Sequence, residues 1–284
     1  KNRPLLEKNR VEVFSSNYAL YGDLSQRVMA TLQQVEKDVE IYSIDEAFIR
    51  LPKSGGADLT VHALSLRETV KKYVGIPVSI GIAPTKTLAK IANRIAKKDP
   101  RHHGVLDLSA FDDLDPILDS IQVGDIWGIG RRSTEKLHRQ GIATALDLRK
   151  SDDEWIRKHL SVVGLRTVME LRGIPCIPLD HEPPPRKSVV CSRSFRKPVF
   201  LLDDLGEAVS SYVSIAAAKL RQEGLAAGNL HVFLRTSPHR EDLAQHSGTF
   251  MVRLQQPTAS TPVLIRAALQ GLKKIHKKGF AYQK

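Results

Sequence analysis

A short polar step between two β-prone runs constrains the fold of this chain more than any other feature. The adjacent carboxylates Asp45 and Glu46 lie between the apolar runs 39–44 and 47–51. Such runs on either side of a polar step predict the two strands of a hairpin. Side chains alternate along a straight strand, but at a bend both carboxylates can lean toward one point. Paired carboxylates at a sheet end suit Mg²⁺, which takes few protein oxygens and several phosphate oxygens. A polar surface turn is the alternative.

Positive charge is concentrated in two tracts of the chain. The 284 residues carry a formal net charge of +12, and the pI is near 9.7. Residues 86–101 and 253–284 are strongly basic, and no acidic residue follows Asp242. One such run is usually a solvated helix face, but two in one chain favour a groove for a polyanion, nucleic acid more often than a membrane surface.

Cysteine usage and hydropathy narrow the class of protein. Only Cys176 and Cys191 occur, in no spacing typical of a metal site, so we expect neither zinc nor disulfides, and a reducing cytosol fits. No apolar run approaches the roughly 18 residues of a membrane span. The sequence therefore predicts a cytoplasmic protein without membrane contact.

A strand followed at once by a helix is predicted over residues 75–98. The β-branched run 75–83 ends at Pro84, and a helix is predicted from Lys86 to Lys98 with Thr85 as its N-cap. A helix N-terminus that follows a strand and carries a lysine in its first turn is suited to binding an anion. The alternative is that Lys86 is ordinary surface.

A Gly-x-Gly step follows Trp127, and short helices are predicted before it and, over residues 133–140, after it. In this helix-hairpin-helix pattern glycines let backbone N–H groups approach a phosphate, which is typical of contact with nucleic-acid backbone irrespective of base sequence. The residues expected to contact DNA here are Gly128, Gly130, Arg131 and Arg132. A capping box at 151–154 predicts the start of another helix.

Consecutive prolines within residues 180–187 predict an extended linker. After it the pattern predicts a small α+β domain. The expected strands are 188–195, 229–236 and 249–254, and the expected helices are 202–223 and 262–278. Hydroxyl side chains, Ser194 among them, share one face of the first strand, and Arg193 lies on the other. Arg193 and Ser194 are expected to contact DNA phosphates.

Taken in order, several motifs resemble one family. They are Tyr-Ser-Ile-Asp-Glu-Ala-Phe at 42–48, Gly-Ile-Ala-Pro-Thr-Lys-Thr-Leu-Ala-Lys-Ile-Ala-Asn at 81–93 and Asp-Ile-Trp-Gly-Ile-Gly-Arg-Arg at 125–132. This order resembles the Y-family of translesion DNA polymerases. Segments 14–18, 170–173 and 191–195 further resemble the UmuC-type catalytic subunits of bacterial DNA polymerase V and their plasmid-borne relatives. The resemblance covers nearly the whole chain.

The resemblance implies an α+β multidomain fold in the form of a right-hand polymerase. Its parts would be a remnant of the fingers region at 1–14, the palm at 15–106, a helical thumb with the helix-hairpin-helix at 107–178, a linker at 179–188 and an α+β little finger at 189–284. Asp45 and Glu46 would be the catalytic carboxylates and hold two Mg²⁺ ions. Lys86, and Lys90 one turn further, would bind the triphosphate of the incoming nucleotide.

The chain departs from the family pattern at both ends. By the resemblance, a further metal-binding aspartate, an aromatic residue that excludes ribonucleotides and the fingers contacts to the triphosphate would precede Lys1. A clamp-binding tail would follow Lys284. We therefore expect the parent protein to polymerise and this chain alone to be inactive.

The implied function is error-prone translesion synthesis in the SOS response to DNA damage, in the cytoplasm and at the nucleoid. The implied partners are primer–template DNA, deoxynucleoside triphosphates, a processed UmuD-type dimer, a RecA filament and the sliding clamp. The alternative is a non-catalytic DNA-binding accessory protein of the damage response, built around the helix-hairpin-helix.

Overall fold

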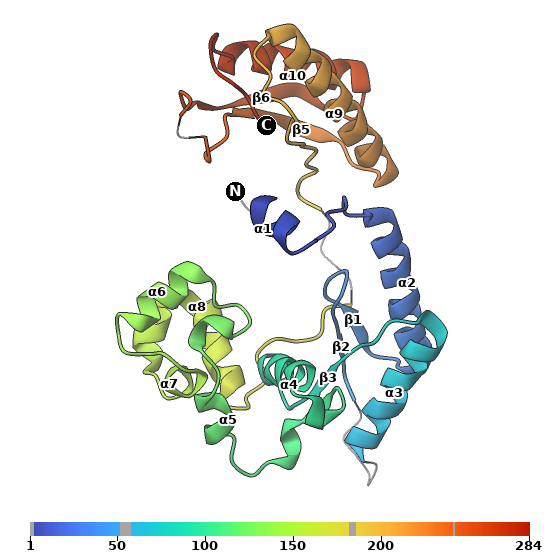
Figure 1. Cartoon of the computed structure of the whole chain (residues 1–284), viewed down its shortest axis with the longest axis vertical. Helices are drawn as coiled ribbons and strands as arrows, with labels where there is room; N and C mark the ends of the chain where they lie inside the picture. Colours follow the sequence, from blue (N-terminus) through green and yellow to red (C-terminus); the bar gives the residue numbers. More distant parts are fainter. Residues whose placement is uncertain (1–2, 52–57, 182–185, 241) are drawn as a thin grey trace. The chain divides into compact units, whose positions relative to one another are not determined.

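A computed structural model describes residues 3–51, 58–181, 186–240 and 242–284 of the chain, which contain both helices and strands (Figure 1). The chain divides into two compact units, Lys1–Pro183 and Pro184–Lys284. The predicted linker falls in part on residues 182–185, which lie outside the described residues. Within the described ranges, no helix has the length and apolarity needed to cross a bilayer.

The first unit carries short strands and a series of helices. Its strands are β1 Val39–Ile41, β2 Ala47–Ile49, β3 Ile80–Ile82 and β4 Val105–Asp107. Its α-helices are α1 Arg3–Lys8, α2 Tyr18–Val35, α3 Leu59–Val74, α4 Lys86–Lys98, α5 Asp115–Asp119, α6 Arg131–His138, α7 Ala145–Arg149 and α8 Asp153–Leu171. Short 3₁₀ turns occur at Pro100–His102, Leu108–Ala110 and Val123–Asp125.

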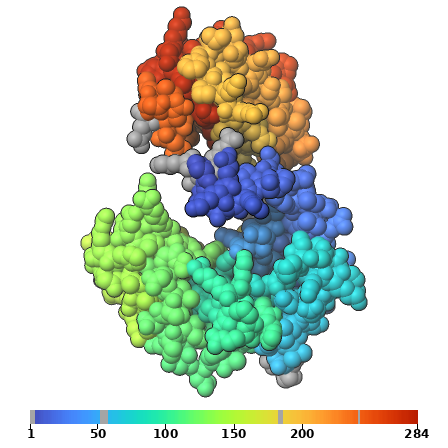
Figure 2. Space-filling view, viewed as in Figure 1, coloured from blue at the N-terminus to red at the C-terminus, as the bar shows by residue number. Residues whose placement is uncertain are grey.

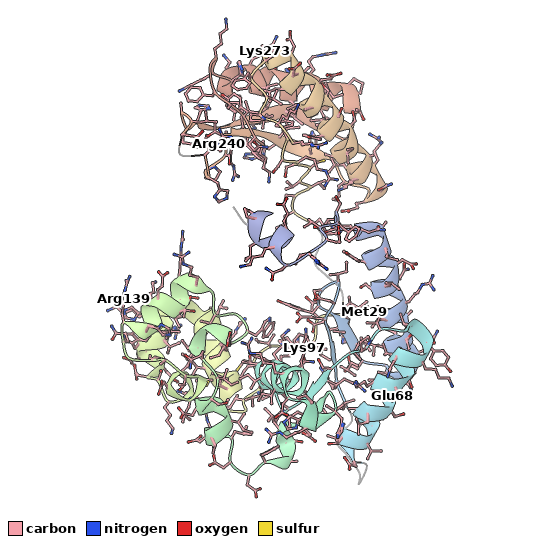
Figure 3. All side chains as sticks on the ribbon, viewed as in Figure 1. Met29, Glu68, Lys97, Arg139, Arg240 and Lys273 are labelled. Atoms are coloured by element: carbon pink, nitrogen blue, oxygen red, sulfur yellow. The ribbon has the colours of Figure 1, made fainter. Side chains whose placement is uncertain are left out.

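The predicted hairpin is confirmed. Strands β1 and β2 pair antiparallel, with Val39 opposite Ile49 and Ile41 opposite Ala47. The strands are shorter than the apolar runs, so the loop takes up residues 42–46 and includes the carboxylate pair. On the inner side, Val39 packs with Met29 of α2, labelled in Figure 3, and with Leu66 of α3.

The strand-to-helix prediction is confirmed in part. Of the run 75–83 only β3 is a strand, and it pairs in parallel with β4, Ile80 opposite Val105. The helix begins and ends where it was predicted, and the Thr85 hydroxyl accepts a hydrogen bond from the Leu88 N–H at 3.3 Å. Gly81 lets β3 pack closely against α4, because a Cβ at this position would lie 2.1 Å from the backbone nitrogen of Asn93 in α4.

Helix α4 packs into the same core as the residues that follow it. Its buried residues Leu88, Ile91 and Ala92 share one hydrophobic cluster with residues of the range 118–171. Members of that cluster beyond residue 110 include Leu118, Val123, Ile126, Leu137, Leu148, Ile156 and Val168. In the space-filling view the atoms of α4 run into those of 107–171 without a gap (Figure 2). One hydrophobic core therefore continues across residues 106 and 107, where the predicted palm would end and the predicted thumb would begin.

The predicted helix after residue 150 is present, but its predicted cap is wrong. Asp152 is the N-cap of α8, since its carboxylate accepts a hydrogen bond from the Trp155 N–H at 2.8 Å. The capping box lies earlier, at the start of α7. There the Thr144 hydroxyl accepts from the Asp147 N–H at 3.1 Å, and the Asp147 carboxylate accepts from the Thr144 N–H at 3.0 Å.

The second unit is a hairpin covered by two helices. Strands β5 Ala227–Arg235 and β6 Ser247–Thr258 pair antiparallel, and α9 Leu202–Gln222 and α10 Thr261–Ile275 pack on one face of them (Figure 1). The core contains Leu205, Val232, Leu234, Leu272 and the fully buried Tyr282.

The strand predicted at 188–195 is wrong, although the α+β class of this unit is as expected. Residues 186–195 are described and form no strand. At the end of this segment the backbone of Phe195 does pair, since its N–H donates to the Gln283 carbonyl at 2.8 Å. Helix α10 ends at Ile275, three residues before the predicted end.

Candidate functional site

The loop between β1 and β2 presents the two predicted metal-binding carboxylates. Asp45 is exposed and Glu46 is half-buried. The Ser43 hydroxyl donates to the Asp45 carboxylate at 2.7 Å. The N–H groups of Tyr42 and Ser43 both donate to the Glu46 carbonyl at 3.0 Å, which closes the loop. The loop therefore fixes the backbone beneath both carboxylates, and Ser43 orients one of them.

The two predicted nucleotide-binding lysines lie in different surroundings. The Lys90 ammonium forms an ion pair with the Glu46 carboxylate at the loop, and both side chains are partly exposed. Lys86 is buried and forms its ion pair with Glu40 of β1. Its ammonium also donates to the Pro178 carbonyl at 2.8 Å and lies 4.8 Å from the centre of the Phe48 ring. Only Lys90 is brought to the carboxylate loop.

Glu40 is a site residue that the sequence analysis missed. Its carboxylate accepts from Lys86 and from the Asp180 N–H at 3.0 Å. A buried ion pair persists when further hydrogen bonds satisfy its charges, and here the Pro178 carbonyl and the Asp180 N–H supply them. The signal was an isolated acidic residue inside a β-prone run.

Glu170 of α8 is the second missed residue, and it is fully buried. One carboxylate oxygen accepts from the N–H and hydroxyl of Thr87 at 2.9 and 3.0 Å. The other accepts from the N–H groups of Cys176 and Ile177 at 3.0 and 3.1 Å. A carboxylate of the chain itself thus occupies part of the helix N-terminus where the sequence suggested an external anion.

The glycine turn presents backbone and cationic groups to solvent. Gly128 is exposed with φ +86°, a backbone conformation that favours glycine. Gly130 is the N-cap of α6 and no side chain caps this helix, so its first N–H groups are available to an anion. The short helix α5 and the 3₁₀ turn Val123–Asp125 precede the glycine turn, as predicted.

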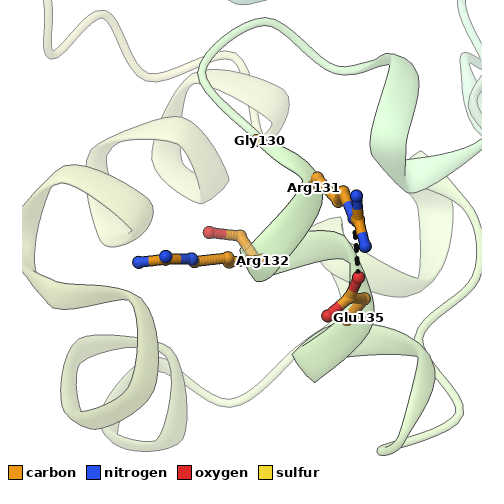
Figure 4. A pocket seen from close by; sticks show the side chains of 5 residues that line it. Gly130, Arg131, Arg132 and Glu135 are labelled. Carbon is orange, nitrogen blue, oxygen red and sulfur yellow. Dashed lines mark hydrogen bonds and ion pairs between the residues drawn. The ribbon is translucent and has the colours of Figure 1, made fainter. Parts of the chain in front are cut away.

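Arg131 and Arg132 border a shallow hollow of about 580 Å³ at this turn (Figure 4). The Arg131 side chain is almost fully exposed and its Nε donates to the Glu135 carboxylate at 3.0 Å. Arg132 extends away from that pair (Figure 4). Arg193 and Ser194, the other predicted DNA contacts, are exposed and belong to the second unit.

The donor set of the loop fits Mg²⁺ in kind. Asp45 and Glu46 supply two carboxylates at a solvent-facing loop, and Mg²⁺ commonly takes one or two carboxylates with water and substrate phosphates as its other ligands. Among the described residues, no three histidine, cysteine, aspartate or glutamate side chains converge on one point. The described loop could therefore supply two protein ligands to such a site.

Comparison with known proteins identifies the family. Residues 3–94 match the impB/mucB/samB family, and residues 186–284 match the C-terminal domain of that family. Protein UmuC of Salmonella typhimurium strain LT2 is 44% identical over 286 residues, which cover 100% of this chain and 68% of that protein. The chain belongs to the impB/mucB/samB family.

Other members of the impB/mucB/samB family match over the same extent. Protein ImpB of Salmonella typhimurium is 42% identical, covering 98% of this chain and 66% of that protein. Protein MucB of Escherichia coli is 38% identical, covering 100% and 68%. The chain thus spans about two thirds of the length of these relatives.

Solved structures show the same fold. A Y-family DNA polymerase chimera of Dbh and Dpo4 has a TM-score of 0.63 and 19% identity, covering 91% of this chain and 71% of that chain. A Dbh ternary complex has a TM-score of 0.52 and 18% identity, covering 96% and 78%. The predicted resemblance and the α+β polymerase fold of this impB/mucB/samB chain are confirmed.

Proposed function

We propose that the protein to which this chain belongs performs error-prone synthesis across damaged DNA in the SOS response. The observation that carries the proposal is the β1–β2 loop, which presents Asp45 and Glu46 in the same compact unit as the exposed glycine turn 128–130. One element offers carboxylates for a metal-bound nucleotide and the other offers amides and arginines for DNA phosphates. Together they suit template-directed nucleotidyl transfer.

In this proposal Asp45 and Glu46 hold two Mg²⁺ ions. When bound, such ions lower the barrier to in-line displacement by stabilising charge on the attacking and leaving oxygens. Ser43 holds the Asp45 carboxylate through its hydroxyl. Lys90 neutralises Glu46 and is accessible from solvent, so we assign it to the nucleotide triphosphate. Lys86 would have to leave Glu40 to reach a phosphate, and we assign it to support of the hairpin.

DNA is proposed to bind through its backbone. Gly128, Gly130, Arg131 and Arg132 offer amides and charge at the glycine turn, and Arg193 and Ser194 do so in the second unit. Contacts to phosphate carry no direct base information. An enzyme that grips DNA in this way tolerates altered template bases, which agrees with a translesion role. Residues 15–106, 107–178 and 189–284 would then act as palm, thumb and little finger.

The partners inferred from the family are proposed with the function. They are primer–template DNA, deoxynucleoside triphosphates, a processed UmuD-type dimer, a RecA filament and the sliding clamp. The basic tract 86–101 and the net charge of +12 support the nucleic-acid partner. A cytoplasmic, nucleoid-associated location follows from the proposed substrate.

Primer extension tests the proposal. The full-length protein, supplied with Mg²⁺, primer–template, nucleotides, the UmuD-type partner and RecA–ATP filament, should extend the primer. Asp45→Ala should reduce extension to background, because it removes a proposed metal ligand, while primer–template affinity measured without a divalent cation should stay unchanged. Asp112→Ala, which removes another exposed aspartate of the first unit, is the matched control and should retain activity. Extension that survives Asp45→Ala would contradict the proposal.

A non-catalytic accessory protein is the second candidate. It is favoured by the ion pair of Glu46 with Lys90, since a carboxylate held by a lysine needs no metal. In that case the full-length protein would bind primer–template tightly and extend nothing, with or without the substitution.

A further inference from the structure

A hydrogen bond links the glycine turn to the carboxylate loop across 85 positions of the chain. The indole N–H of Trp127 donates to the Tyr42 hydroxyl at 3.2 Å. Trp127 directly precedes Gly128, the exposed glycine proposed to approach DNA. Tyr42 opens the loop that ends with Asp45 and Glu46. The hydrogen bond therefore joins the proposed DNA-binding turn directly to the proposed metal-binding loop.

The two hydrogen-bonded side chains belong to an aromatic cluster of three residues, Tyr42, Phe48 and Trp127. The ring centres of Tyr42 and Trp127 are 5.4 Å apart at an interplanar angle of 80°. Phe48 lies 5.7 Å from Tyr42 and 5.6 Å from Trp127. Rings at these separations and angles attract one another. Because Tyr42 and Phe48 stand on opposite sides of the carboxylate pair in sequence, Trp127 contacts both legs of the loop.

The loop has little freedom to absorb a movement of Tyr42. The Tyr42 N–H donates to the Glu46 carbonyl at 3.0 Å, so the backbone of Tyr42 is bonded directly to that of a metal-binding residue. Ser43, the next residue, donates its hydroxyl to Asp45 at 2.7 Å. A displacement at Tyr42 is therefore passed to both carboxylates through short bonds.

The glycine turn is equally well anchored on its other side. Asp125 forms an ion pair with Arg94 of α4 at 2.5 Å. Ile126 and Ile129, which flank the tryptophan and the first glycine, are buried in the core shared with α4. Between these anchors Gly128 and Gly130 remain exposed. Contact of DNA with the glycines would thus act on Trp127, the half-buried side chain of the turn that reaches the loop.

We propose that Trp127 is a positioning residue that couples DNA binding at the glycine turn to cation binding at Asp45 and Glu46. The inference rests on the proposed function, because it takes the loop as the metal site and the turn as the DNA site. DNA on the turn holds Trp127 against Tyr42 and Phe48 and fixes the carboxylates for the cation. Coupling of this kind is reciprocal: whatever factor DNA adds to cation affinity, the cation adds to DNA affinity.

The test measures that reciprocal factor in the full-length protein. Mn²⁺ binding is followed by electron paramagnetic resonance with and without primer–template DNA, and DNA binding is followed by anisotropy with and without Mn²⁺. We expect each ligand to tighten the other at least about fivefold in the unaltered protein. Trp127→Phe keeps a ring and removes the N–H, and Tyr42→Phe keeps a ring and removes the hydroxyl. Each should reduce the factor to below about twofold while the separate affinities stay near their original values.

Trp155→Phe is the matched control. Trp155 lies in α8 of the same unit and stacks on His159 at 4.4 Å, with no ring contact to the loop. This variant should retain the full coupling factor. A circular dichroism melt checks that all three variants fold.

The outcomes separate the inference from the function on which it rests. Undiminished coupling in both Trp127→Phe and Tyr42→Phe, or no coupling in the unaltered protein, overturns the role of Trp127 and leaves the polymerase proposal standing. Equal loss in Trp155→Phe also overturns it, because the effect would then be one of general packing. Mn²⁺ binding that is absent, or unchanged by Asp45→Asn, overturns both proposals.

Discussion

Two ion pairs hold the two ends of one hairpin, and they differ in almost everything except charge. Lys86 and Lys90 lie one turn apart on α4 and pair with Glu40 on β1 and Glu46 in the loop. The side chains of the first pair are each 8% exposed, whereas those of Lys90 and Glu46 are 25% and 40% exposed. The first pair has further hydrogen bonds from the backbone, and the second faces solvent. The first pair is therefore shielded from solvent, whereas the second is placed where a metal ion or phosphate could exchange with its partners.

The largest effect is expected when the buried Lys86–Glu40 pair, called the inner pair below, is broken. Glu40→Ala leaves the Lys86 ammonium buried without its anion, which should lower the free energy of unfolding of the first unit by about 3–5 kcal/mol. Tryptophan fluorescence reports on this unit, because both tryptophans of the chain, Trp127 and Trp155, lie in it. Replacing both partners, Glu40→Leu with Lys86→Met, should recover most of the loss. A loss below about 1 kcal/mol in Glu40→Ala would show that the inner pair is no more structural than an exposed one.

Asp147 provides a third case, because its carboxylate is held by backbone N–H groups and not by a lysine. Hydrogen bonds from the N–H groups of Ala143 and Thr144 lower the pKa of Asp147 below its usual value. The group is thus anionic in the folded protein at a pH where the unfolded chain binds the proton. Its stabilisation is present above the unfolded pKa, about 3.9, and is lost as the pH falls through the lowered folded pKa.

Asp147→Asn should therefore cost about 1 kcal/mol near neutral pH, and the difference should shrink as the pH falls through the unfolded pKa of about 3.9 toward the lowered folded pKa. Denaturant unfolding of both proteins across this range measures it. A difference that stays constant with pH would mean that the charge of Asp147 adds nothing to its hydrogen bonds.

The smallest effect on stability is expected when the partly exposed Lys90–Glu46 pair, the outer pair, is broken. Lys90→Met should change the free energy of unfolding by no more than about 1 kcal/mol, since one exposed ion pair contributes little. Its effect on function should be larger: in full-length protein the KM for nucleotide should rise, because a cation has left the carboxylate loop. A KM unchanged in Lys90→Met would remove Lys90 from the proposed triphosphate site and weaken the contrast between the two pairs.

Local signals were enough to predict the elements that position the site. Helix α4 follows its prediction from Lys86 to Lys98 because its N-cap Thr85 and its apolar stripe lie within a few residues of one another. The hairpin follows from the two apolar runs. Helices α2 and α3 were not predicted, although Asn17 and Asp58 cap them through their side chains. Attention to the caps of these two helices would have found them.

The failures concern residues whose state depends on distant parts of the chain. The alternating pattern at 188–195 predicted a strand, but the described residues of this segment form none. Its last residue, Phe195, forms a backbone hydrogen bond with Gln283. Burial of Lys86 depends on Glu40 and on the Pro178 carbonyl, 46 and 92 positions away. A lysine in the first turn of a helix gives no sign of such contacts. Sequence therefore identified the carboxylate loop but could not distinguish the two lysines beside it.

The core that α4 shares with residues 107–171 also limits how relatives of this protein can exchange parts. A recombination joint between the two compact units, Lys1–Pro183 and Pro184–Lys284, leaves every hydrophobic cluster on one side of the joint. A joint at residues 106 and 107 would require Leu88 and Ile91 from one parent to pack against Leu118 and Val168 from the other. Functional hybrids within the family should therefore inherit the carboxylate loop and the glycine turn together, as a single heritable block, while the C-terminal unit is free to change parent.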